Sequence, residues 1–185
     1  MLFGSKALFA VECYHEPRYP NDRGWVFGRM CAWCRGVELG DLSEPDCMLN
    51  VTEGCFQDCL GQLDSLRDPA VDSLPDGAAF RRLEAAIYGD DDRTTQEVYA
   101  DAVRFRKFEF LTSWGQSFDR VSAFLHDAGD EFRVLYRLRC GTQGSARVTR
   151  EQVERPLLAF LEWMAIEKHQ VPRDERKLAS DSPGE

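Results

Sequence analysis

The chain has 185 residues, of which 43% are hydrophobic and 30% charged, a balance typical of one folded domain and too apolar for general disorder. Its formal net charge of −9 disfavours phosphate backbones and anionic lipid, so we expect neither nucleic acid nor a membrane as partner. No secretory signal pattern and no apolar run near the roughly 20 residues of a membrane span is found, which predicts a cytoplasmic protein with free thiols.

Two strands and a hairpin are predicted at the start of the chain. Residues 6–14 are rich in Phe, Val and Tyr, and the run 15–24 that follows contains Pro and Gly, which indicates a strand and then a loop. Residues 25–35 are aromatic or apolar nearly throughout and predict a second strand. Arg35-Gly36 then leads into residues 37–39, so we expect a hairpin to close there.

Two helices are predicted in the middle of the chain. Apolar residues recur at helical spacing over residues 49–66, although two glycines weaken that helix. Residues 65–77 contain prolines and aspartates and are expected to form a loop. A second apolar stripe over residues 78–88 ends at Gly89 and predicts a short helix.

Three strands are predicted after the polar run 89–95, at residues 105–114, 118–126 and 131–140. In the last of these, apolar residues alternate with arginines at a period of two, as in a half-buried antiparallel strand. We therefore expect Arg133, Arg137 and Arg139 to lie on a largely solvent-exposed face of the sheet.

The last element is a helix that continues to about Lys168. Thr149 and Gln152 form a capping pair before an apolar stripe of helical period, and Pro156 requires either a kink or a later start near Glu154. Residues 171–185 are Pro, Ser, Gly and charges without periodicity, which predicts a disordered tail. The expected fold is therefore a single α+β domain over residues 1–170, with a mostly antiparallel sheet of about five to six strands and about three helices.

Cysteine is the strongest candidate for a metal site. Cys31, Cys34, Cys55 and Cys59 are four thiols in two closely spaced pairs, as in some zinc sites. On a strand, however, positions three apart face opposite sides, and Cys55 and Cys59 share a helix face with Leu63, as small core residues do. We therefore expect core cysteines, with no metal and no cofactor.

No local pattern indicates catalysis. The histidines His15, His126 and His169 have no partner that the sequence identifies, and the acidic residues lack the alternating ligands and central Gly of a calcium loop. We predict no catalytic residue and no enzymatic activity. An active site assembled across the fold stays open as an alternative, and it would require a perturbed His or Cys in a deep cleft.

A resemblance to a known family is found in the first 41 residues. The segments that carry it are residues 1–4 (MLFG), 9–12 (FAVE), 25–29 (WVFGR) and 33–41 (WCRGVELGD). This pattern of aromatic residues and glycines resembles immunity protein family 42 of bacterial polymorphic-toxin systems. The resemblance implies a small α+β protein, made beside a toxin gene, that binds the toxin domain of its neighbour and blocks it without catalysis.

The acidic charge suggests where a toxin would bind. Acidic side chains suit the basic cleft of a nuclease or similar toxin. The candidate toxin-binding residues are Asp64, Asp68, Asp72, Asp76, Asp90, Asp91 and Asp92. The arginine-bearing strand face is the alternative surface and would suit an acidic toxin. An adaptor or chaperone for a secreted effector is the alternative function.

Overall fold

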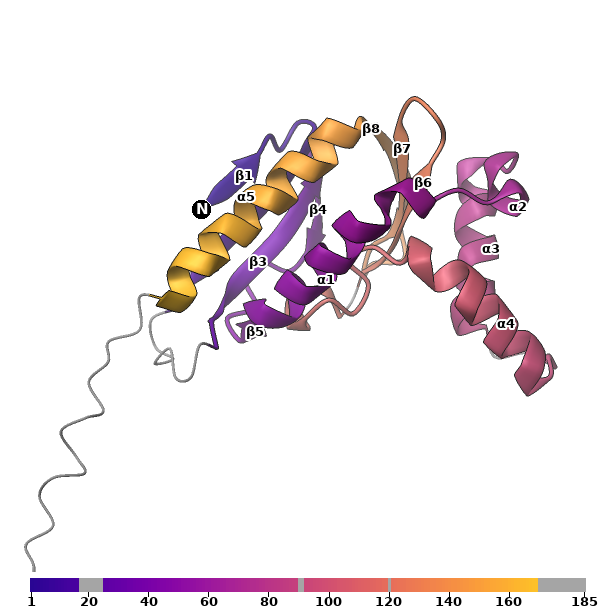
Figure 1. Cartoon of the computed structure of the whole chain (residues 1–185), viewed down its shortest axis with the longest axis horizontal. Helices are drawn as coiled ribbons and strands as arrows, with labels where there is room; N and C mark the ends of the chain where they lie inside the picture. The colour runs from indigo at the N-terminus through magenta and orange to yellow at the C-terminus, as the bar shows by residue number, and fades with distance from the viewer. Residues whose placement is uncertain (17–24, 90–91, 120, 170–185) are drawn as a thin grey trace, which may run out of the picture.

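The computed structural model describes residues 1–16, 25–89, 92–119 and 121–169 (Figure 1). Two antiparallel sheets and five α-helices make up this part of the chain. The strands of the first sheet are β1 (Leu2–Gly4), β2 (Phe9–His15), β3 (Phe27–Cys34), β4 (Val37–Gly40) and β5 (Cys47–Met48). Those of the second sheet are β6 (Ser122–Asp127), β7 (Phe132–Arg137) and β8 (Gln143–Val148).

The first sheet has the order β1-β2-β3-β4, and β5 pairs with the start of β3. The β3–β4 hairpin closes at Arg35 and Gly36, whose φ angles of 50° and 81° are those of a two-residue turn that matches strand twist. This hairpin confirms the expectation from the sequence. It also directs the end of β4 towards the second half of the molecule.

Helices α1 (Leu49–Gln62) and α5 (Arg150–His169) cover one face of the first sheet (Figure 1). Phe9, Val11 and Met30 point from the strands into the core on this side. Phe56 of α1 and Phe160 of α5 meet edge to face at 5.1 Å between ring centroids. Aromatic burial against both helices therefore holds this layer together.

The second sheet has the order β6-β7-β8 and packs against α3 (Asp76–Tyr88). The rings of Phe80 in α3 and Phe124 in β6 lie 5.3 Å apart. Helices α2 (Pro69–Asp72) and α4 (Thr95–Phe105) lie beside α3, and α3 and α4 project from the rest of the molecule in Figure 1. Three short 3-10 turns are η2 (Leu63–Ser65), η3 (Arg106–Phe108) and η4 (Gln116–Phe118).

The connection from η3 to β6 joins the two sheets into one core. Its side chains Phe108, Phe110 and Phe118 are fully buried. Phe110 contacts Phe9 of the first sheet with ring centroids 5.8 Å apart, and its backbone N–H donates to the carbonyl of Ala123 in β6 at 2.9 Å. The buried apolar residues of both sheets therefore form one continuous cluster.

The α+β class with antiparallel pairing is confirmed, but the element counts differ from the expectation. The described residues contain eight strands in two sheets and five α-helices, where about five to six strands and about three helices were expected. The expected loop over residues 65–77 contains α2, which begins after Asp68, with Pro69 at its first position. The predicted tail at residues 171–185 lies outside the described residues.

The strand predicted over residues 105–114 is wrong. This segment contains the end of α4, the turn η3 and an irregular connection, with one isolated bridge between Glu109 and Phe124. Helix α4 escapes detection because its apolar residues Tyr99 and Val103 are exposed. The aromatic residues of the 105–114 segment are buried in the core without forming a strand. In the sequence, such a run looks the same as a buried strand.

Candidate functional site

A groove lies between the end of β4, the turn η4 and the β7–β8 turn. It has two halves, with volumes of about 940 Å³ and about 440 Å³. The two halves share the lining residues Asp119, Val121, Leu138 and Arg139, so they form one continuous depression. Its walls come from both sheets, and it therefore exists only in the folded chain.

The larger half is strongly acidic. Its carboxylates come from β4, from the connection that follows β4 and from the residue directly after η4. They belong to Glu38, Asp41, Glu44, Asp46 and Asp119. Among the described lining residues of this half, Arg139 is the one basic side chain. Like charges held this close create a negative potential that attracts cations.

Backbone donors hold these carboxylates in place. Glu38 accepts a hydrogen bond from the N–H of Leu42 at 3.2 Å, and Asp41 accepts one from the N–H of Ser43 at 2.9 Å. Glu44 accepts one from the N–H of Asp46 at 3.1 Å. Each ionised carboxylate has about four acceptor positions, so these bonds leave capacity for a ligand.

The wall of the groove at η4 requires close backbone packing. Gly40 has a φ of 120°, and a Cβ there would lie 3.0 Å from the ring of Phe118. The side-chain oxygen of Gln116 accepts a hydrogen bond from the N–H of Met48 at 3.1 Å, which ties η4 to β5. Glycine therefore allows β4 to end directly against η4.

Ser117 lies at the floor of the acidic half. The residue is 2% exposed, and its hydroxyl has no hydrogen-bond partner of ordinary geometry among the described residues. The Cys47 thiol is a neighbour, and burial raises the pKa of this thiol, which keeps it protonated. Sulfur is a weak hydrogen-bond partner, so the hydroxyl of Ser117 stays effectively unsatisfied.

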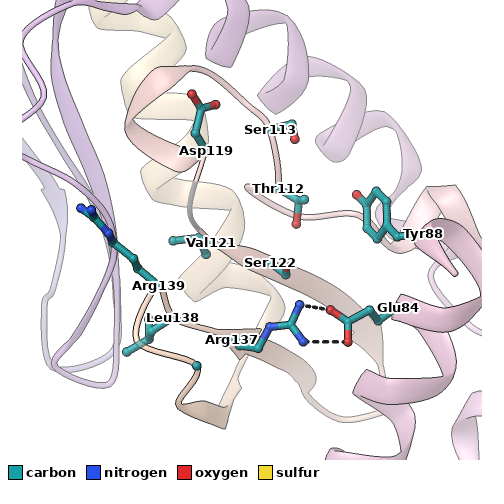
Figure 2. Close-up of a pocket in the computed structure, with 11 residues that line it drawn as sticks. Glu84, Tyr88, Thr112, Ser113, Asp119, Val121, Ser122, Arg137, Leu138 and Arg139 are labelled. Carbon is teal, nitrogen blue, oxygen red and sulfur yellow. Dashed lines mark hydrogen bonds and ion pairs between the residues drawn. The ribbon is translucent and has the colours of Figure 1, made fainter. Parts of the chain in front are cut away.

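The smaller half carries a paired charge (Figure 2). Figure 2 shows Arg137 of β7 facing Glu84 of α3, and its Nη1 donates to the Glu84 carboxylate at 2.9 Å. Tyr88 donates to Glu109, and burial raises the pKa of Tyr88 far above its usual range. Two carboxylates, of Glu84 and Asp119, and two guanidinium groups, of Arg137 and Arg139, are among its described lining residues, so this half is close to neutral.

The backbone beside the smaller half adopts an uncommon conformation. Leu111 and Ser113 have φ angles of 63° and 58°, which are left-handed values that few side chains adopt. Thr112 between them accepts from the N–H of Ala123 at 2.8 Å and donates to the carbonyl of Ala123 at 3.0 Å. Anchoring by β6 therefore supports a strained segment at the groove wall.

The acids predicted from sequence lie elsewhere. Asp68 is buried, accepts two hydrogen bonds from Arg104 at 2.6 Å each, and caps α2 through Ala70 N–H at 2.9 Å. The guanidinium of Arg104 lowers the pKa of Asp68. Asp72 and Asp76 are also paired within the chain, with His126 at 2.8 Å and with Arg147 at 3.1 Å.

Three of the seven predicted acids are exposed in the described part, and one of them is Asp72, which is paired with His126. Asp64 is exposed and forms an ion pair with Arg150, and Asp92 is exposed shortly before α4. Asp90 and Asp91 lie outside the described residues. The structure brings none of the described members of this set into the groove. Whether they contact a toxin stays a prediction.

The prediction that the arginines of β7 lie on a solvent-exposed face is wrong for Arg133. This residue is 3% exposed and donates to the carbonyls of Leu74 and Val71 at 2.8 and 2.9 Å. It also donates through Nε to Nδ1 of His126 at 3.2 Å. Helices α2 and α3 cover this face of β7, so the alternation of arginine with apolar residues does not indicate solvent exposure here.

The four cysteines considered for zinc are separated by the fold. Cys31 and Cys34 are buried on opposite faces of β3, and burial raises the pKa of Cys34 to about 12. Cys59 is buried and Cys55 half-buried on α1. Within the described ranges, no group of three or more His, Cys, Asp or Glu side chains is arranged to hold a metal ion.

The outer face of the first sheet carries an ordered aromatic cluster. Glu12 accepts hydrogen bonds from the Tyr14 hydroxyl and the Trp33 indole N–H, both at 2.8 Å. Lys6 forms an ion pair with Glu12 at 2.6 Å and lies 4.1 Å above the Trp33 ring. The neighbouring strand β4 continues from this face to the acidic half of the groove.

The sequence of this chain matches a known protein family over most of its length. The family described as Immunity protein 42 matches residues 1–163, which include all lining residues of the groove. The chain belongs to the Immunity protein 42 family. The resemblance in the first 41 residues is thereby confirmed and extends across both sheets. Family membership indicates a role in immunity to a toxin.

A solved structure supports the same fold for this Immunity protein 42 chain. CdiI from Burkholderia dolosa AUO158 aligns with a TM-score of 0.65 at 12% sequence identity, over 88% of this chain and 99% of that chain. At this identity the likeness concerns the fold. No curated protein matches the sequence significantly. No helix in the described part of the chain is long and apolar enough to cross a bilayer.

Proposed function

We propose that this Immunity protein 42 chain neutralises a cognate toxin domain by binding it directly, without catalysis. The observation that carries the proposal is the family match over residues 1–163. The toxin domain is encoded by a neighbouring gene and acts in the cytoplasm, where this chain meets it. Binding alone is sufficient for protection when the partner's active surface is covered.

The side chains of the groove favour binding of a partner over catalysis. Its acidic half presents fixed carboxylates, and its other half presents an ion pair between Arg137 and Glu84. The buried thiol of Cys47 and the Tyr88 hydroxyl both have raised pKa values, so neither is ionised near neutral pH. Protonated groups of this kind are poor nucleophiles.

Co-expression tests the proposal. We expect growth of a susceptible bacterium that expresses the C-terminal toxin domain from the adjacent upstream gene to be restored by this chain. A stable complex of the two proteins should co-purify by size exclusion, because mutual burial of a specific surface produces slow dissociation. Rescue without a complex would contradict neutralisation by direct binding.

The adaptor or chaperone function is the second candidate, and the same experiment separates it. An adaptor would form a complex with its effector and leave toxicity unchanged. Continued killing in the presence of a complex would therefore favour that function. A matched toxin domain from an unrelated system is the control, and this chain should not protect against it.

A further inference from the structure

The acidic half of the groove has the properties of a binding site for positive charge. Five carboxylates and one guanidinium line it among the described residues. The carboxylate of Asp119, an exposed residue directly after η4, has no partner among these residues. Backbone N–H groups position Glu38 and Glu44, so little conformational entropy is lost when a ligand binds.

An unsatisfied polar group supports a ligand independently of the charge. Ser117 is 2% exposed at the floor of this half, and its hydroxyl lacks a hydrogen-bond partner of ordinary geometry. A buried unpaired hydroxyl is costly in the free protein. An N–H donor that enters the groove would pair with the surrounding carboxylates, and a small shift of the floor at η4 would let it also reach the Ser117 hydroxyl.

The groove is large enough for side chains. Its acidic half, at about 940 Å³, accommodates one or more lysine or arginine side chains with the backbone that carries them. Arg139, at the boundary with the smaller half, opposes deeper entry of a cation. A cationic segment of a protein therefore fits this half better than a small anion or a nucleic acid.

We propose that this groove receives a lysine- or arginine-bearing segment of the toxin domain. The inference rests on the proposed function and adds to it the docking surface and the chemistry of the partner. The outer sheet face that adjoins the groove contributes Trp33 and Tyr14, residue types that often dominate interface energetics. Toxin binding thus combines charge in the groove with aromatic contact beside it.

Charge reversal in the groove tests the inference. The variant carries Glu38→Lys and Asp119→Lys, both at exposed positions. The matched control carries Asp58→Lys and Glu162→Lys, exposed acids of α1 and α5 outside the groove. The probe is the toxin domain from the adjacent gene, made catalytically inactive, and its dissociation constant is measured by calorimetry.

We expect the groove variant to weaken binding on the order of 100-fold and the control by less than about 3-fold. The association rate of the wild-type protein should fall as salt rises, and that dependence should be weaker in the groove variant. Equal affinities for the groove variant and the control would overturn the inference. If the wild-type protein itself fails to bind, the proposed function fails instead.

Two further variants separate loss of groove charge from misfolding and from binding at another surface. Glu38→Gln with Asp119→Asn keeps hydrogen-bond acceptors and size, so folding is preserved while two negative charges are removed. It should weaken binding by roughly 10-fold. Asp64→Lys with Asp92→Lys changes two of the acids predicted from the sequence, both exposed and outside the groove. A larger loss from that pair than from the groove pair would place the docking surface elsewhere and overturn the inference.

Discussion

The buried side chain of His126 shows how one residue connects two layers. Its Nε2 lies 2.8 Å from Asp72, and its Nδ1 accepts from Arg133 Nε at 3.2 Å. Because Arg133 can only donate, Nδ1 carries no proton, and the proton of the neutral ring is on Nε2. Burial first, and then the charge of Arg133, lower the pKa of His126 below its usual value of 6.5.

A pH dependence of stability follows from this residue. The unfolded chain binds a proton at His126 near pH 6.5, whereas the folded protein resists protonation until lower pH. The free energy of unfolding is therefore highest above pH 6.5 and falls as pH drops below that value. Urea titrations between pH 5 and 8 measure this slope, and His126→Gln should reduce it. An unchanged slope in that variant would assign the effect to other groups.

Helix α4 buries little apolar surface against the rest of the molecule. Phe105 is its one buried residue among those described, and Tyr99 and Val103 are 71% and 66% exposed. Its N-terminus has a complete capping box, in which the Glu97 N–H donates to Thr94 Oγ1 at 3.3 Å and Thr94 N–H donates to Glu97 at 2.8 Å. Local capping therefore adds to the stability that the ion pair between Arg104 and Asp68 provides.

Removal of this cap should destabilise α4 locally. Thr94→Ala is expected to cost about 1 kcal/mol in the helix, because it leaves a backbone donor unsatisfied. Amide hydrogen exchange should accelerate in residues 95–105, and the global unfolding free energy should change less. Thr95→Ala, at the neighbouring exposed position, is the matched control. Equal exchange rates in the two variants would contradict a role for the cap.

The two sheets share one core through the connection between η3 and β6. Phe110 contacts Phe9 at 5.8 Å and Trp114 at 5.5 Å, and Trp114 contacts Phe56 of α1 at 5.7 Å. This aromatic chain links the first sheet and its helices to the segment that pairs with β6. Other residues of this connection, namely Thr112, Ser113, Gln116 and Ser117, line the groove, so its shape depends on the same packing.

Phe110→Ala tests that linkage. Truncation of a fully buried phenylalanine is expected to lower the free energy of unfolding by about 3–5 kcal/mol. Because the core is continuous, circular dichroism and tryptophan fluorescence should still report one shared transition in denaturant. Two separated transitions would show that the sheets unfold independently. Leu158→Ala, at a 49% exposed position, should change stability by less than about 0.5 kcal/mol.

The groove illustrates the limit of prediction from sequence. The predicted acids cluster along the chain at residues 64–76 and 90–92, whereas the acidic wall combines residues near 38–46 with Asp119. Asp68, Asp72 and Asp76 lie at intervals of four residues in sequence, yet each is paired with an Arg or His side chain from a distant segment. The density of acidic residues along a chain does not indicate which carboxylates form ion pairs or hydrogen bonds within the folded protein.

The sequence by itself determined the α+β class, the β3–β4 hairpin, helices α1, α3 and α5 and the family, because these depend on local periodicity, turn residues and short motifs. Only the tertiary structure decided that Arg133 of the second sheet is buried, that the apolar residues of α4 are exposed, and that an acidic groove forms. Each of these depends on contacts between residues far apart in sequence, where burial and pairing override local preference.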